Sequence, residues 1–494
     1  MFTILPDLSA ELAGEKEMKS TKTCKYPRVL LINNKPICRQ GAVGFTLGNL
    51  FRGWPKNSIA QIYVSGCEPD LTICNRNWKL EFHNKRMPFP LKVFVKAWRS
   101  SRTKASGSDP KLLDARYALK KQSTNTNRAG SNFAPLSVAK SFLLRLLDLC
   151  SHDVPEETRS SIREFQPQVI YSYLDDVHIA TLVSDVSARY EIPVVPHFFD
   201  DWITLPLPSP GFRRILSKRL IRSTVALMKV APIRFAVSDE MAREYSKRYH
   251  LSFVPFMNCI DPSVRPPIHE RSQSKEKFQL AYVGGFYPNR SPQLVEVADA
   301  LLQLRAEGVS GEIVIYPQEQ EEYNSNIILH PQVRYALKTE ERLLHTEDAL
   351  IDAFLHIDNF ESGVSNYLRF SMSAKIPWCL ACGLPVFAYG PPQNETIQYV
   401  RRTQTGIVVD REESMRLREG LRTLLTDTKL RKKLGRNSRK EFQRSHNGRK
   451  VCDRFREELL AAAFTSVSNT ASFQKHNVVV SKKVEERNNT VMEL

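Results

Sequence analysis

A lysine and two serines stand directly before an apolar helical pattern in the segment FSMSAKIPWCLACG, which begins at Phe370. Ser371 and Ser373 can cap the N-terminus of a helix that runs through Leu380. Lys375 then falls in the first helical turn, beside exposed backbone amides and the positive end of the helix dipole. Amides, dipole and ammonium group together favour an anion such as a phosphate. An ordinary capped helix of an α/β sheet is the alternative.

Two apolar strands accompany this helix. Gly383 suits a left-handed turn at the helix end, and Pro385–Tyr389 reads as a short buried strand. The segment FQLAYVGGF, Phe278–Phe286, is a second buried strand that ends in Gly284 and Gly285. Glycines at this place let the backbone approach a diphosphate closely.

Arg290 follows the glycine pair and precedes a helical pattern over Pro292–Arg305. Its guanidinium group is a forked donor that suits phosphate oxygens. A glycine pair after a strand is a weak signal by itself. Followed by Arg290 and then, further along the chain, by Lys375 and a Gly-Leu-Pro-Val strand, it predicts a diphosphate-binding site.

The first half of the chain offers further polar candidates. Gly41 and Gly44 lie ahead of a predicted helix whose N-terminus would face a ligand, although an ordinary strand–helix turn also uses glycine. The loop HFFDDW begins at His197 and follows a predicted strand. Asp201 in this loop could orient His197 or accept a proton as a general base. A buried structural histidine and a helix-capping aspartate are the alternatives.

A weaker cluster consists of Asp175, Asp176 and His178, at the end of the strand that begins at Val169. Asp176 either caps the next helix or, with its neighbours, faces a substrate.

Apolar runs that alternate with amphipathic stretches must position these residues, and this order predicts parallel, doubly wound sheets. The strands expected in the first half are Val29–Ile32, Ala60–Val64, Val169–Ser172, Pro193–Pro196, Phe235–Val237 and Phe253–Phe256. Those expected in the second half are Leu280–Val283, Glu312–Ile315, Ala353–Ile357, Val386–Ala388 and Thr405–Val408. The fold class is therefore α/β, with two Rossmann-like doubly wound domains that face each other across a crevice.

Charge and cysteine content narrow the possible partners. The net charge is +18, and much of it gathers in Arg213–Lys229 and Lys429–Lys450. These segments are either a solvated basic surface or a surface that attracts anionic lipid headgroups. No zinc finger, RNP pattern or helix-turn-helix context supports nucleic acid as a partner. Nine cysteines at irregular spacing favour reduced thiols, and Cys379 and Cys382 form a single CxxC that we assign to core packing.

No run reaches the length of about 20 apolar residues that a membrane-spanning helix needs, and no signal peptide is evident. We therefore expect a cytoplasmic protein with peripheral contact to the inner face of a membrane.

At the residues around Lys375 and Arg290, the chain resembles retaining nucleotide-sugar glycosyltransferases of the glycosyltransferase family 4 type, which have the GT-B fold and act in bacterial cell-surface polysaccharide pathways. Arg28–Ser65 resembles the opening strand, loop, helix and strand of that family, and Gln168–Trp202 its later strand, helix and histidine-bearing loop. The resemblance covers most of the chain from 28 to 456, except 78–135.

This resemblance implies a glycosyltransferase that moves a hexosyl group from a nucleotide diphosphate-sugar donor to a lipid-linked or saccharide acceptor. It places His197 near the transferring sugar and Glu395 in contact with the sugar or diphosphate. Glu395 equally suits the start of the helix at Thr396. Ser373 and Lys375 belong to the donor site. With cations and a helix dipole at the leaving diphosphate, no metal and no cofactor are expected.

The sequence departs from the family at two positions. Relatives carry two glutamates eight residues apart, and these positions hold Phe370 and Trp378 here. Trp378 either packs against the nucleotide in a sub-family with another mode of ribose recognition, or the protein no longer turns over. Glu361 in the preceding loop is a candidate replacement carboxylate. A nucleotide-sugar epimerase on the same fold and a non-catalytic sugar-nucleotide or polyanion binding protein are the competing functions.

The expected domain boundaries follow the resemblance and the prolines and charges of Asp261–Lys277. They are an N-terminal extension (1–27), a Rossmann-like acceptor domain (28–260) with a mobile loop near 100–131, a linker (261–277), a Rossmann-like donor domain (278–447), a helix that returns to the first domain (448–464) and a disordered tail (465–494).

Overall fold

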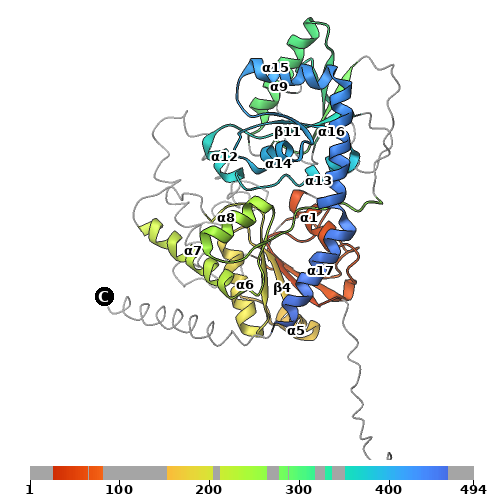
Figure 1. The fold of residues 1–494 in the computed structure, drawn as a ribbon. Coiled ribbons are helices and arrows are strands. Elements are labelled where there is room, and N and C mark those ends of the chain that lie inside the picture. The colour runs from red at the N-terminus through yellow and green to blue at the C-terminus, as the bar shows by residue number, and fades with distance from the viewer. Residues whose placement is uncertain are drawn as a thin grey trace, which may run out of the picture.

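The computed structural model describes two lobes, each built on a parallel sheet (Figure 1). The described residues are 26–39, 41–64, 66–81, 153–203, 212–263, 277–286, 289–317, 327, 329–336 and 351–465. The predicted mobile loop near 100–131, the predicted tail from 466 onward and most of the predicted linker, 264–276, lie outside these residues.

The first sheet has seven strands in the order β3-β2-β1-β4-β5-β6-β7, and every neighbouring pair is parallel. Its strands are β1 (Val29–Asn33), β2 (Ile59–Tyr63), β3 (Arg76–Lys79), β4 (Val169–Tyr173), β5 (Val194–Phe198), β6 (Phe235–Ala236) and β7 (Val254–Pro255). The strands β1, β2, β4 and β5 are buried throughout, as expected of central parallel strands covered by helices on both faces.

The second sheet has six strands in the order β10-β9-β8-β11-β12-β13, again parallel throughout. Its strands are β8 (Phe278–Val283), β9 (Gly311–Tyr316), β10 (Val333–Tyr335), β11 (Ala353–Ile357), β12 (Val386–Tyr389) and β13 (Gly406–Val409). Every strand expected from the sequence overlaps an observed strand, and the predicted class of two Rossmann-like sheets is confirmed.

Helices connect most of the successive strands in the described ranges and cover both faces of each sheet (Figure 1). Those of the first lobe are α1 (Gly41–Leu50), η1 (Lys56–Ser58), α5 (Glu156–Phe165), α6 (Val177–Tyr190), α7 (Phe212–Val230) and α8 (Asp239–Tyr249). Those that follow are α9 (Ser291–Ala306), α12 (Ser362–Leu368), α13 (Ile376–Cys382), α14 (Glu395–Thr403), α15 (Ser414–Thr426), α16 (Thr428–Glu441), the π-helical η3 (Phe442–His446) and α17 (Gly448–Phe464).

The last helix, α17, lies against the first sheet although it follows the second one in sequence (Figure 1). Phe455 on α17 is fully buried, and its ring centroid lies 5.2 Å from that of Phe51 and 5.6 Å from those of Tyr171 and Phe235. Edge-to-face aromatic contacts add to the free energy of simple burial. The chain therefore crosses between the lobes twice and ties them together.

Side chains of the first domain also hold the backbone that precedes Lys375. Asp200 accepts hydrogen bonds from the Ser371 hydroxyl at 2.6 Å and from the Tyr367 hydroxyl at 3.0 Å. Asn258 donates from Nδ2 to the carbonyl oxygen of Ala374 at 2.6 Å. The loop between α12 and α13 is therefore fixed by the opposite domain.

Cys38 and Cys67 form a disulfide, so the expectation of reduced thiols throughout is wrong for this pair. Cys38 follows β1 and Cys67 follows β2, and the fold brings their Cα atoms to 6.5 Å. Sequence spacing alone does not reveal this proximity, because it depends on the pairing of the two strands. The remaining described cysteines are free thiols, among them Cys379 and Cys382, which are buried.

Among the described residues, no helix is both long and apolar enough to cross a membrane.

Candidate active site

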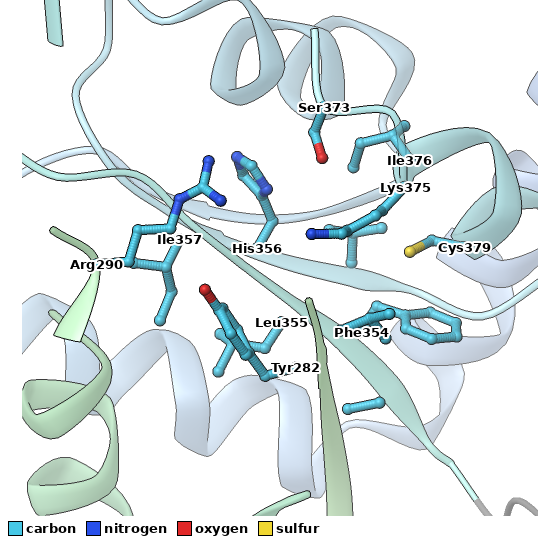
Figure 2. A pocket seen from close by; sticks show the side chains of 13 residues that line it. Tyr282, Arg290, Phe354, Leu355, His356, Ile357, Ser373, Lys375, Ile376 and Cys379 are labelled. Carbon is cyan, nitrogen blue, oxygen red and sulfur yellow. The ribbon is translucent and has the colours of Figure 1, made fainter. Parts of the chain in front are cut away.

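A pocket lies between one face of the second sheet and the start of α13 (Figure 2). Three polar side chains with basic groups, Arg290, His356 and Lys375, line it together with Ser373 and Tyr282. Its apolar lining comes from β8, β11, β12 and α13. Figure 2 shows Arg290 on one side, Lys375 on the other and the His356 ring between them. The two cations singled out in the sequence therefore share one pocket.

Arg290 is held at the start of α9 by the end of the neighbouring strand. Its Nη2 lies 3.2 Å from Oδ1 of Asp358, which follows β11. Burial lowers the pKa of Arg290, but the Tyr282 hydroxyl and the Asp358 carboxylate outweigh it, so the pKa is raised overall and the charge is kept. The guanidinium group is thus a fixed positive charge beside the pocket.

The Asp358 carboxylate contacts three polar side chains beside the pocket. Besides Arg290, it accepts a hydrogen bond at Oδ2 from Asn394 at 3.1 Å, and His356 Nε2 lies 3.3 Å from the same oxygen. Burial raises the pKa of Asp358, while His356, Arg290 and the Asn394 hydrogen bond lower it to well below the usual carboxyl range. Asp358 is therefore ionised and offsets one positive charge of the pocket.

Lys375 reaches the pocket from just before α13, and not from the first turn as predicted. The helix begins at Ile376, and no side chain caps its N-terminus. Pro377 occupies the first helical turn, where proline is favoured, and this fixes the start one residue after Lys375. Ser371 donates to Asp200 instead of capping the helix, so the expected capping by the serines is not observed. Ser373 lines the pocket.

The glycine pair lies directly after β8, as predicted, and two of its backbone groups form hydrogen bonds within the protein. Gly284 has a φ of 102°, which favours glycine, and its amide donates to the carbonyl oxygen of Tyr316 at 2.9 Å. The carbonyl oxygen of Gly285 accepts a hydrogen bond from the Tyr282 hydroxyl at 2.7 Å. The Gly284 amide is therefore not available to a diphosphate, in contrast to the expectation.

The glycines of the first domain lie inside α1 and not ahead of it. Gly41 is the first residue of the helix, with a φ of 72°. A Cβ atom at Gly44 would lie 2.5 Å from the carbonyl oxygen of Cys38, so this glycine allows α1 to pack closely on the preceding loop. Neither glycine lines the pocket that holds Lys375.

His197 lies within β5 and not in the loop after it, and its side chain is fully buried. Its Nδ1 is 2.8 Å from the Tyr171 hydroxyl, and burial lowers the pKa of His197 to about 3. Asp201 is also buried, but it accepts hydrogen bonds from Tyr245 at 2.8 Å and from Arg248 at 3.0 Å. Neither residue lines the pocket, and the hydrogen bonds described for Asp201 do not include one to His197.

The two positions where the resemblance predicts glutamates, Phe370 and Trp378, are part of the protein interior. Trp378 is buried, and its ring packs against Phe354 at a centroid distance of 5.1 Å. It does not line the pocket, so it does not pack against a ligand there. Phe370 is buried beside the guanidinium groups of Arg248 and Arg369, at 5.7 Å and 4.9 Å from its ring centroid. Both aromatic rings therefore serve packing in the interior.

Glu395 does not line the pocket either, although the resemblance places it in contact with the sugar or diphosphate. It is the first residue of α14, is fully buried and forms an ion pair with Arg402 at 2.6 Å. Burial raises the pKa of Glu395, and Arg402 partly offsets this effect. Glu361 precedes α12 and is exposed, away from the pocket lining.

In the cluster of Asp175, Asp176 and His178 after β4, Asp176 caps the following helix. Asp176 accepts hydrogen bonds from the backbone amides of His178 and Ile179, at 2.8 Å and 3.2 Å, and so caps α6. Asp175 accepts a hydrogen bond from Asn34 at 3.2 Å. Across the described ranges, no three His, Cys, Asp or Glu side chains gather where they could hold a metal ion.

The sequence did not single out His356, which lines the pocket, or Asp358, which forms an ion pair with Arg290 beside it. Both belong to the run AFLHIDN, which is read as one buried strand and its end. The available signal was the occurrence of a basic residue inside an otherwise apolar parallel strand, where a polar side chain needs a partner.

Two parallel sheets with interleaved helices, linked by a final helix that returns to the first, define the GT-B fold. Solved structures of glycosyltransferases share it. HepE of Anabaena in complex with UDP-glucose is 12% identical, with a TM-score of 0.54 over 88% of this chain and 99% of that one. Sucrose-phosphate synthase of Thermosynechococcus elongatus is 12% identical, with a TM-score of 0.55 over 88% and 100%.

A third similar structure is the α,α-trehalose 6-phosphate synthase of Burkholderia multivorans, 9% identical, with a TM-score of 0.52 over 91% of this chain and 98% of that one. At such identities the likeness establishes the fold alone. No protein-family model matches the sequence, and no curated protein matches it.

Proposed function

We propose that this protein is a glycosyltransferase that takes a sugar from a nucleoside diphosphate-sugar donor. The observation that carries the proposal is the pocket in which Arg290 and Lys375 approach the same space from opposite sides (Figure 2). In α/β folds of this kind, ligands bind near the carboxyl ends of the parallel strands. Similar folds occur in glycosyltransferases that were crystallised with UDP and UDP-glucose, which supports the choice of donor class.

The chemistry follows from the charges. As the bond between sugar and diphosphate breaks, negative charge grows on the diphosphate leaving group. Arg290, fixed by Asp358, and Lys375 would neutralise that charge in a partly dry site, where electrostatic stabilisation is strongest. On this proposal the two cations act in place of a divalent metal, and transfer retains the configuration of the sugar, as the family resemblance implies.

The acceptor is proposed by its chemical class and by the domain that binds it. We propose a lipid-linked or saccharide acceptor in cell-surface polysaccharide synthesis, with the first domain as the acceptor domain. Exposed basic residues on α16, among them Lys432, Lys433 and Arg436, support peripheral contact with an anionic membrane. The Cys38–Cys67 disulfide is typical of oxidising compartments, and this counts against the expected cytoplasmic location.

One observation favours a second candidate, a protein that binds sugar nucleotides without turning them over. Phe370, at one of the two positions where relatives carry glutamate, contributes its carbonyl oxygen to a hydrogen bond from Ser238 of the first domain at 3.2 Å. The Phe370 side chain itself is buried and has no hydrogen-bonding group, so it offers no carboxylate to a ribose. Binding without transfer across a panel of donors would support this candidate.

A thermal-shift titration with UDP, GDP, TDP and CMP tests the donor site, because a ligand that binds only the folded state raises the unfolding midpoint. We expect a rise with at least one nucleoside diphosphate, its loss in Lys375→Ala, and its retention in Lys433→Ala, which removes an exposed lysine of α16. No rise with any nucleotide would overturn the proposed function.

A further inference from the structure

His356 is an unusual residue for its position in the fold. It lies in β11, a central strand of the second sheet, between the apolar residues Leu355 and Ile357. Only 9% of its surface is exposed, and that part faces the pocket shared with Arg290 and Lys375 (Figure 2). A polar side chain in such a place costs free energy unless a partner satisfies it.

The described protein groups leave one ring nitrogen of His356 without a hydrogen bond. His356 Nε2 is buried without a hydrogen-bond partner within the described part of the chain. The nearest charged group is Asp358 Oδ2, an ion-pair neighbour at 3.3 Å, and that carboxylate also pairs with Arg290 and accepts a hydrogen bond from Asn394. Buried polar groups of this kind mark places where a ligand or an ordered water supplies the missing partner.

The charges around the ring indicate which ligand would do so. The ionisable groups that face it are Asp358 directly after its own strand, Arg290 ahead of α9, Lys375 ahead of α13, Tyr282 on β8 and the Cys379 thiol on α13. Asp358 cancels one of the two permanent positive charges, which leaves a surplus of one. A diphosphate diester carries a negative charge on each phosphate, so a protonated His356 would complete the match.

We propose that His356 is a direct ligand of the donor diphosphate, donating from Nε2 to a phosphate oxygen, and that its protonation tightens nucleotide binding as the pH falls. The inference rests on the proposed function and adds a third cationic group to Arg290 and Lys375. Histidine is the side chain suited to this behaviour, because its charge changes near neutral pH. Binding of the anion favours the protonated ring, so proton uptake must accompany binding.

The test is isothermal titration calorimetry with the nucleotide sugar of the base identified above, at pH 6, 7 and 8. A nucleotide sugar has both phosphates esterified, so its own charge stays constant over this range. Wild-type affinity should rise as the pH falls, by at most about tenfold per pH unit for one linked proton. His356→Gln, which cannot become charged, should bind more weakly and with no pH dependence. His250→Gln removes an exposed histidine of the first domain and should behave as wild type.

Titration in two buffers of different ionisation enthalpy measures the proton uptake in the wild-type protein and requires no variant to fold. Affinity independent of pH in the wild type, or equal affinity and pH dependence in His356→Gln, would overturn the inference and leave the proposed function standing. Absence of nucleotide binding by the wild type at every pH would overturn both.

Discussion

At the scale of single residues, the two buried histidines of the sheets differ in what surrounds them. His197 has a hydrogen-bonding partner in Tyr171 and aromatic neighbours, including Phe199 and Phe235. His356 faces cations, a carboxylate and a pocket. The first is therefore a residue of the core that stays neutral, whereas the second is a candidate ligand.

The burial of His197 makes folding depend on pH. Its pKa is lowered to about 3 in the folded protein, from 6.5 for an unperturbed histidine. The unfolded chain thus binds the proton first, and stability is complete above about pH 6.5 and falls by about 1.4 kcal/mol per unit as the pH drops towards 3. Between pH 6.5 and 5, we predict that His197→Gln loses about 2 kcal/mol less unfolding free energy than the wild type.

Urea unfolding followed by tryptophan fluorescence at the two pH values measures this difference. Comparing the variant with the wild type cancels the contribution of His446, whose pKa burial also lowers. Equal losses of stability in the two proteins would show that His197 is not held neutral by burial.

Arg290 and Lys375, which the sequence singled out together, line one pocket of the structure, because the loops that follow parallel strands meet at the same edge of a sheet. The sequence did not show that Trp378 and Glu395 point into the interior. Side-chain direction depends on packing between elements that are far apart in sequence, such as the contact of Trp378 with Phe354. A single sequence carries little information on such contacts.

At the scale of elements, the loop that ends at Lys375 is positioned by the opposite domain. Asn258 donates to the carbonyl oxygen of Ala374, and its own Oδ1 accepts from Asn49 at 3.2 Å and from the amide of Cys259 at 2.9 Å. This amide side chain therefore connects the end of the first domain to the residue next to Lys375. Its geometry couples the domain contact to the pocket.

We predict that Asn258→Asp weakens nucleotide binding about tenfold, because a carboxylate in place of the Nδ2 donor repels the carbonyl oxygen of Ala374 and leaves it unpaired. Calorimetric dissociation constants measure the effect. Asn437→Asp is the matched control, since Asn437 donates in the same way to the carbonyl oxygen of Gln404 at an exposed site far from the pocket lining. Unchanged affinity in Asn258→Asp would show that this contact between the domains does not influence nucleotide binding in the pocket.

Element prediction succeeded for the central strands and for β7 and β13 at one edge of each sheet, and it missed the strand at the other edge. The two strands that were not predicted are β3, with the sequence RNWK, and β10, with the sequence VRY, and each is the first strand in its sheet order. An edge strand covers less core and therefore lacks the continuous apolar run that identifies a central parallel strand. Pairing with the neighbouring strand creates these elements.

At the scale of the whole molecule, α17 ties the second domain back to the first through one aromatic anchor. We predict that Phe455→Ala lowers the free energy of unfolding by about 3–5 kcal/mol, because it leaves a cavity among four aromatic rings. Phe464→Ala, at the exposed end of the same helix, should change stability little. Similar losses in both variants, measured by chemical denaturation, would contradict the role of Phe455.

The two-sheet architecture could be predicted because the alternation of apolar runs and amphipathic segments extends along most of the chain. The sequence did not show which domain supplies the residues that line the pocket. The sequence suggested a site between the domains, whereas all residues that line the pocket belong to the second domain. The first domain acts through contacts such as that of Asp200 with Ser371, which only the folded structure brings together.

The central claim is that Lys375 neutralises the charge of a leaving diphosphate. The most direct test is the turnover of the donor identified by the nucleotide panel, measured as release of the nucleoside diphosphate, in the wild type, Lys375→Ala and the surface control Lys433→Ala. Loss of the charge should slow Lys375→Ala by about 100-fold or more, a loss near 3 kcal/mol, with Lys433→Ala unaffected. Near-normal turnover in Lys375→Ala would contradict the account.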